Sequence, residues 1–195
     1  MKITLGSLVA GAGFGTVTSL ANALSSPYTE IGAPLKGTPG GRTAKVLSLL
    51  LDSGWAWAAL AVAAGWLAGT LVRGALAGTL SLIAATVAYY LTDAYVADAE
   101  SAMAYWAVAA LLFGPALGAV GAAVRRPGRV GLFAALTVPV GAAVQMVVMP
   151  PRPHLTPTPS IVLAEAVVWT GAVLGVVLAV RRFRAERRTV TVSPM

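Results

Sequence analysis

The stretch GALAGTLSLIAATVAYYLT, residues 74–92, decides the fold of this chain. It carries no charge over a length close to the ~20 apolar residues with which a helix crosses a bilayer. It is followed at once by DAYVADAE, residues 93–100, which brings three carboxylates and another tyrosine. Residues 74–92 therefore predict a transmembrane helix, and polar chemistry begins where that helix ends.

The composition of the whole chain also indicates a membrane protein. Of 195 residues, 57% are hydrophobic and only 11% are charged, and the mean hydropathy is +0.80. These values lie outside the range of soluble globular domains. We expect an all-α fold, a polytopic membrane helical bundle that forms one domain over residues 1–195. Because cysteine is absent, disulfides, thiolate nucleophiles and cysteine metal sites are excluded.

About six stretches have the length and apolarity of a transmembrane helix. They are residues 3–24, 53–72, 74–92, 101–124, 130–150 and 161–180. A Gly/Pro-rich loop is expected over residues 25–45. The first stretch, with Lys2 before it and ANA at residues 21–23, also resembles a secretory signal, but its apolar part is long for one, and we expect a retained span.

Lysine and arginine predict the orientation. With the amino terminus inside, ten basic residues lie on the inner side: Lys2, Arg73, Arg125, Arg126, Arg129, Arg181, Arg182, Arg184, Arg187 and Arg188. Four lie outside: Lys36, Arg42, Lys45 and Arg152. We therefore expect a multi-pass protein of the cell membrane with both termini cytoplasmic. The basic tail, residues 181–195, is expected to meet anionic lipid headgroups.

These basic residues flank apolar runs and are not interleaved with aromatics, so membrane lipids are the expected partners and nucleic acid is not. The oligomeric state stays open.

Polar side chains gather toward the outer ends of the expected spans. The carboxylates there are Asp52, Asp93, Asp98, Glu100 and Glu165. Small residues gather toward the other side, as pairs four apart that let helices approach closely. These pairs are Gly11 and Gly15, Gly65 and Gly69, Gly74 and Gly78, Gly114 and Gly118, and Gly171 and Gly175. We expect a cup with a closed inner half, and an outer pocket that contains both Asp93 and Glu165.

Helical spacing places carboxyl groups beside aromatic rings. Residues three and four apart share a face, so Tyr89 and Tyr90 accompany Asp93, and Trp169 lies one turn from Glu165. The candidate catalytic residues are Asp93, Glu165 and Asp52. The candidate substrate-binding residues are Tyr89, Tyr90, Trp169, Trp55, Trp106, Tyr105, Gln145 and Asn22.

Each of these features has a plainer alternative. Interfacial Trp and Tyr commonly anchor a helix in the membrane, and Asp52 and Asp93 can be helix-end residues that face water. Glu165 is harder to explain in this way, because it lies inside an apolar helix. Asp98, Glu100 and His154 are expected in aqueous loops.

A carboxyl group beside aromatic faces suits one kind of chemistry. An apolar environment keeps the acid protonated, and a neutral acid can protonate an alkene or an epoxide. The carbocation that results is stabilised by ring faces. These are the requirements of protonation-initiated terpene cyclisation.

The number of spans, together with YYLTD at residues 89–93 and LAEAVVW at residues 163–169, resembles a known family. It is that of the small membrane terpene cyclases of actinobacterial indole-terpenoid pathways, which are similar in plan to fungal meroterpenoid cyclases. The resemblance implies metal-independent cyclisation, without a cofactor, of a farnesyl or epoxyfarnesyl chain on an aromatic headgroup. The chain contains no DDxxD-type cluster, in agreement with a reaction that uses no metal.

Two other functions stay open. Carboxylates that open outward can bind a cation or couple proton movement in a transporter, although no inverted repeat is visible. A structural or resistance protein without catalytic activity would account for every polar residue described above except Glu165 and Gln145, which lie deep within their expected spans. The substrate, the product skeleton and the identity of the acid are not determined by the sequence.

Overall fold

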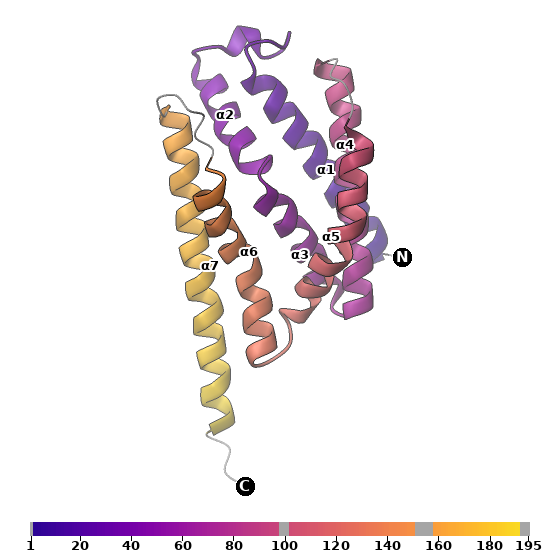
Figure 1. Cartoon of the computed structure of the whole chain (residues 1–195), viewed down its shortest axis with the longest axis vertical. Helices are drawn as coiled ribbons and strands as arrows, with labels where there is room; N and C mark the ends of the chain where they lie inside the picture. The colour runs from indigo at the N-terminus through magenta and orange to yellow at the C-terminus, as the bar shows by residue number, and fades with distance from the viewer. Residues whose placement is uncertain (1, 98–101, 151–157, 192–195) are drawn as a thin grey trace.

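The computed structural model describes residues 2–97, 102–150 and 158–191, with side chains described as far as Arg187, and this part of the chain is helical almost throughout (Figure 1). The prediction of an all-α bundle is confirmed. The elements are α1 (Lys2–Ser25), the short 3₁₀ helix η1 (Ala33–Leu35), α2 (Pro39–Leu51), α3 (Gly54–Ala68), α4 (Leu71–Ala97), α5 (Met103–Ala123), α6 (Arg129–Val148) and α7 (Pro159–Thr191).

Within the described ranges, five helices are long and apolar enough to cross a membrane: α1, α4, α5, α6 and α7. Helices α2 and α3 are bent by 64° at a short break and together make a sixth candidate. The 15 residues of α3 extend only about 22 Å, less than the ~30 Å of a hydrocarbon core, so α3 alone is too short. In Figure 1, α1, α4 and α6 run upward, while α2 with α3, α5 and α7 run downward.

Two boundaries differ from the expectation. The Gly/Pro-rich loop over residues 25–45 is wrong in its second part, because α2 begins at Pro39, where the Thr38 hydroxyl accepts a hydrogen bond from the Gly41 N–H at 3.1 Å. A capping threonine followed by proline is a strong helix start. The span over residues 53–72 is also too long, since α3 ends where Gly69 takes a left-handed φ of 78°, and Val72 belongs to α4.

Close helix packing follows the glycines, as predicted for most of the pairs. Gly11 and Gly15 bring α1 against the backbone carbonyls of α4, and Gly65 brings α3 against the carbonyl of Gly118 on α5. Gly74 of α4 meets the same Gly118, so α3, α4 and α5 touch backbone to backbone. The pair on α7 is different, because nothing lies within 4 Å of the position of a Cβ on Gly171.

Helices α6 and α7 form a separate pair at one side of the bundle (Figure 1). Helix α7 packs on α6 and α2, and within the described residues it makes no contact with α1, α4 or α5. Ala142, Met146 and Val168 form the core of this side, together with Leu50 and Trp55. The helix continues to Thr191, so the first part of the expected basic tail is helical.

Candidate functional site

The break between α2 and α3 positions the first carboxylate. Asp52 ends α2, and Ser53 takes an extended conformation before α3 starts at Gly54. Asp, Ser and Gly are weak helix formers with alternatives to helical hydrogen bonding, so a break at this point is physically reasonable. From α6, the Gln145 Oε1 atom accepts a hydrogen bond from the Trp55 N–H at 2.9 Å. Gln145 therefore satisfies a free N–H at the start of α3.

Asn22 joins three helices around this break. Its Nδ2 atom donates hydrogen bonds to Asp52 Oδ2 and to the Tyr89 hydroxyl, both at 3.0 Å. Its Oδ1 atom accepts a hydrogen bond from the Ser48 hydroxyl at 2.5 Å. We call Asn22, Ser48, Asp52 and Tyr89 the polar network. It connects α1, α2 and α4 with the helix break.

Asp93 lies one turn beyond Tyr89 on α4. Its carboxyl group is close enough to Asp52 for the two charges to interact. The hydroxyl of Ser19, on α1, lies beside Asp93, but it makes no well-oriented hydrogen bond within the described residues although Ser19 is fully buried. The second carboxylate therefore borders the polar network.

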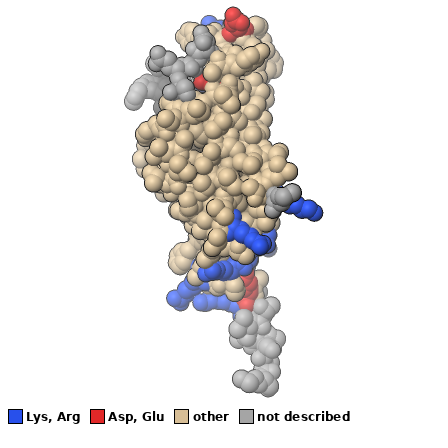
Figure 2. All heavy atoms as spheres, turned by 90° about the vertical axis from the view of Figure 1, so that its right-hand side faces the viewer, with Lys and Arg blue, Asp and Glu red and all other residues tan. Residues whose placement is uncertain are grey.

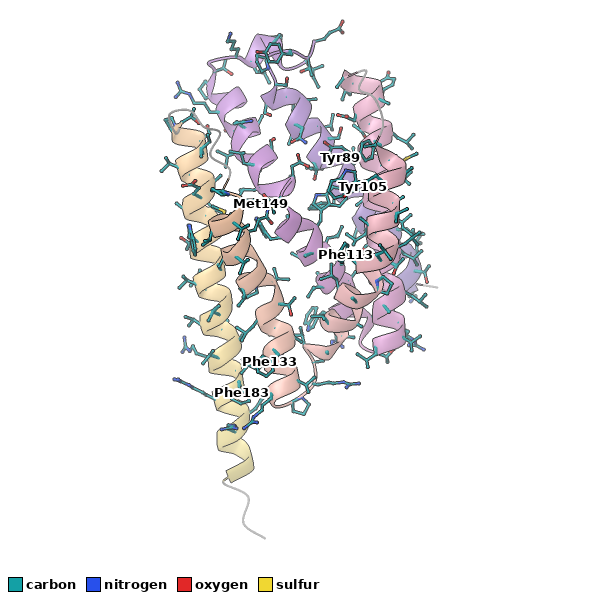
Figure 3. All side chains as sticks on the ribbon, in the orientation of Figure 1. Tyr89, Tyr105, Phe113, Phe133, Met149 and Phe183 are labelled. Carbon is teal, nitrogen blue, oxygen red and sulfur yellow. The ribbon has the colours of Figure 1, made fainter. Side chains whose placement is uncertain are left out.

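Aromatic rings continue from the network toward the interior. Phe14 and Trp57 have ring centroids 5.5 Å apart, Trp57 and Tyr89 6.1 Å, and Tyr89 and Tyr90 5.1 Å, all in edge-to-face arrangements. We call these four residues the aromatic row. Because Tyr89 belongs to both sets, the row begins at the polar network, in the upper half of the bundle as viewed in Figure 3.

The site is open on one side. Asp52 is exposed, whereas Asn22, Tyr89 and Asp93 are partly buried and Ser48 is buried. Asp52 is therefore the member of the polar network that is most accessible from outside. The arrangement is suited to holding positive charge, through two carboxylates and several ring faces.

Comparison with known proteins gives one match. A model of a family of unknown function, DUF6518, matches residues 44–195. The chain belongs to the DUF6518 family. No curated protein and no solved structure matches the chain. The match includes Ser48, Asp52, Tyr89 and Asp93, whereas α1, which supplies Asn22, precedes it.

The remaining candidate residues of this DUF6518 protein lie elsewhere. Glu165 is buried on α7, on the far side of α2 from α1, and α7 does not contact α4 within the described residues. Glu165 and Asp93 therefore lie on helices that are not packed against each other in the described part of the chain. Trp169 also lies on α7 and is 42% exposed.

Three predicted aromatic contacts are also outside the site. Tyr105 and Trp106 are 71% and 52% exposed and contact each other edge to face on α5. Trp55 packs in the core between α3, α6 and α7. Asp98, Glu100 and His154 lie outside the described residues. No group of three or more His, Asp or Glu residues is placed to hold a metal ion in the described part of the chain.

The structure places four residues at the site that are not among the candidates predicted from the sequence. Trp57 follows Trp55 by two residues, so the two side chains lie at a similar depth in the expected span. This depth could have indicated Trp57 as a candidate, and Trp57 makes the ring contact with Tyr89. Ser48 lies one turn before Asp52 on α2, but helical spacing could indicate Ser48 only once α2 was known. Phe14 and Ser19 carry no comparable signal, since they belong to an apolar helix whose neighbours are known only from the fold.

Proposed function

We propose that this DUF6518 protein is a membrane-integrated, metal-independent terpene cyclase. It would protonate an alkene or an epoxide of a prenylated aromatic substrate. The observation that carries the proposal is the junction at Tyr89, where a hydrogen-bonded carboxyl group meets a row of aromatic rings. One part supplies a proton and the other stabilises the cation that the proton creates.

The sequence favours Asp93 as the general acid, because two tyrosines share its helical face, but the hydrogen bond from Asn22 makes Asp52 our preferred acid, with Asp93 as the alternative. Asn22 donates to Oδ2 of Asp52, which leaves Oδ1 to carry the proton. Asn22 also donates to the Tyr89 oxygen, so the Tyr89 hydroxyl hydrogen is not used in that bond and can be donated to a ligand. For a polar acceptor such as an epoxide oxygen, the acid must come within about 2.6 to 3.2 Å.

In the proposed reaction, the proton adds to the epoxide oxygen or to an alkene carbon. The electrons of the next alkene form the new carbon–carbon bond, and the positive charge moves along the chain. Trp57, Tyr89 and Tyr90 offer ring faces to that charge, each worth about 0.5 to 2 kcal/mol. Loss of a proton from the last cation gives a cyclic isomer of the substrate.

The proposal includes an orientation in the cell membrane. Both termini are cytoplasmic, and the polar network lies toward the outer side. The support is the distribution of charge, since the blue basic residues gather mainly toward the lower end in Figure 2 and an uncharged belt lies above them. A prenylated substrate dissolves in the same bilayer and can reach the open side of the site laterally.

The test uses purified protein in detergent, without added metal, and a panel of linear prenylated aromatic compounds. The readout is conversion to cyclic isomers of equal mass. Asp52→Asn keeps the shape of the side chain and removes the transferable proton, so turnover should be lost while binding is retained. Glu165→Gln is the matched control, because it makes the same change on α7. If Asp52→Asn and Asp93→Asn both retain full turnover, neither carboxyl group is the acid.

A second role for the aromatic row can be tested in the same assay. Tyr89→Leu should lower the rate or divert the product, because the cation loses a ring face. Tyr105→Leu removes a tyrosine that is outside the site and should leave both unchanged. Equal effects of the two substitutions would speak against a role for the row.

One observation favours a second candidate, cation-coupled or proton-coupled transport. Helix α2 is broken from α3 at Asp52, and broken helices in transporters present carbonyl groups and carboxylates to ions. The buried Ser19 hydroxyl beside Asp93 fits an oxygen-lined cation site. Ion-driven solute movement in proteoliposomes, abolished by Asp52→Asn, together with no isomerisation of any substrate, would establish this function instead.

A further inference from the structure

A groove runs between α6 and α7, at the side of the bundle away from the polar network. It is an open groove with a volume of about 470 Å³, and all of the side chains that line it are apolar. Val140, Val144 and Val147 lie on its α6 side, and Trp169, Val173 and Val177 on its α7 side. In a bilayer, such a groove faces hydrocarbon chains.

On α7, two arginines follow the apolar residues that line the groove. Trp169, Val173 and Val177 are four residues apart, so they form one stripe along the helix, and the next step of the stripe is Arg181. Arg184 lies two turns beyond Val177 and shares its face. Both arginines are exposed. No ion pair joins either of them to another side chain that the structure describes.

The neighbouring residues Arg182 and Arg187 contact other side chains of α7. Arg182 is paired with Glu186 at 3.0 Å, and the guanidinium of Arg187 stacks on the Phe183 ring at 4.8 Å. Glu186 also accepts a hydrogen bond from the Gly128 N–H at 3.3 Å, just before α6. This contact fixes the end of α7 against the start of α6. Phe183 marks this region at the lower end of α7 in Figure 3.

The dimensions match one leaflet of a membrane. From Trp169 to Arg181 the helix rises about 18 Å at ~1.5 Å per residue. Half of a ~30 Å hydrocarbon core is about 15 Å. A lipid with its headgroup at the arginines would therefore lay an acyl chain along the whole groove.

We propose that the groove between α6 and α7 binds an anionic phospholipid of the leaflet at the lower end of the bundle. The phosphate lies between Arg181 and Arg184, and one acyl chain fills the groove as far as Trp169. Arginine suits a phosphate because its planar guanidinium donates two parallel hydrogen bonds. The site is independent of the proposed cyclase chemistry.

The full chain in detergent, freed of native lipid, is titrated with dioleoyl phosphatidylglycerol or dioleoyl phosphatidylcholine, and bound lipid is counted by native mass spectrometry. One phosphatidylglycerol should bind well before any phosphatidylcholine. Arg181→Gln with Arg184→Gln should weaken this binding about 25-fold, at about fivefold per arginine. Glycerol phosphate, which has the headgroup without chains, should not compete at equal concentration.

Two further variants separate the parts of the site. The matched control is Arg73→Gln with Arg126→Gln, which removes the same charge elsewhere, and it should retain the tight site. Val144→Phe with Val173→Phe fills the groove at two exposed positions and should remove the site with the arginines intact. Equal affinity for the two lipids, equal losses in both arginine pairs, or full binding in the filled groove would overturn the proposal.

Discussion

Replacement of Asn22 by leucine tests the polar network most simply, because it removes every hydrogen bond that joins the three helices there. Asn22 makes three such bonds, to Asp52, Tyr89 and Ser48. An interhelical hydrogen bond in a membrane protein contributes about 0.6 kcal/mol, and one in a buried site up to ~1.5 kcal/mol. Asn22→Leu should therefore lower the free energy of unfolding by about 2 to 4 kcal/mol.

The assay is reversible unfolding in mixed micelles, followed by tryptophan fluorescence. Trp57, which lies against Tyr89, reports on this part of the bundle. Ser48→Ala removes one of the three bonds and should cost about a third as much. Ser25→Ala is the control, because among the described residues the Ser25 hydroxyl bonds only to a carbonyl of its own helix, and it should cost less than ~0.5 kcal/mol. If Asn22→Leu is no more destabilising than Ser25→Ala, the network does not hold the helices together.

Three other predictions concern packing and topology. Gly118→Ala should destabilise the bundle by more than ~2 kcal/mol, because its Cβ would overlap the backbone of α4. Gly13→Ala, whose Cβ would meet nothing within 4 Å, should be neutral or stabilising in the same unfolding assay, and similar losses from the two substitutions would contradict this. Gln145→Leu should cost about 1 to 3 kcal/mol by leaving an N–H at the start of α3 unpaired, and a loss below ~0.5 kcal/mol would show that water replaces the side chain. Because the chain has no cysteine, Ser26→Cys should react with an impermeant maleimide in intact cells and Thr70→Cys only after lysis, and the reverse pattern would invert the proposed orientation.

The sequence was sufficient for the fold class and for most of the helices, because length and apolarity alone define a membrane span. It did not reveal α2, since PGGRTAKVLSLLL, residues 39–51, is too polar and too rich in glycine at its start to count as a span. Helix α2 becomes part of a span only together with α3, across the break at Asp52. Asp, Ser and Gly at residues 52–54 permit a break there, but the hydrogen bond from the Trp55 N–H to Gln145 of α6 is a tertiary contact that the sequence does not show.

The sequence predicted only part of the candidate site, because the rest again depends on tertiary contacts. Spacing along one helix correctly put Tyr89, Tyr90 and Asp93 on α4 near one another, and Asp52 and Asn22 were both candidates. Spacing carries no information on which helices are neighbours. Glu165 was therefore grouped with Asp93 on the basis of depth alone, although α7 packs against α6 and α2.

The measurement that tests the central proposal most directly is cyclisation of an alkene substrate in D₂O. If the site protonates an alkene carbon, the cyclic product gains one deuterium in a carbon–deuterium bond that does not exchange, and it is one mass unit heavier than the product formed in H₂O. The wild-type chain and Glu165→Gln should both form this product, and Asp52→Asn should not. No cyclic product from the wild type, a product without deuterium, or equal deuterium incorporation by Asp52→Asn would contradict the proposal that Asp52 delivers the proton that starts cyclisation.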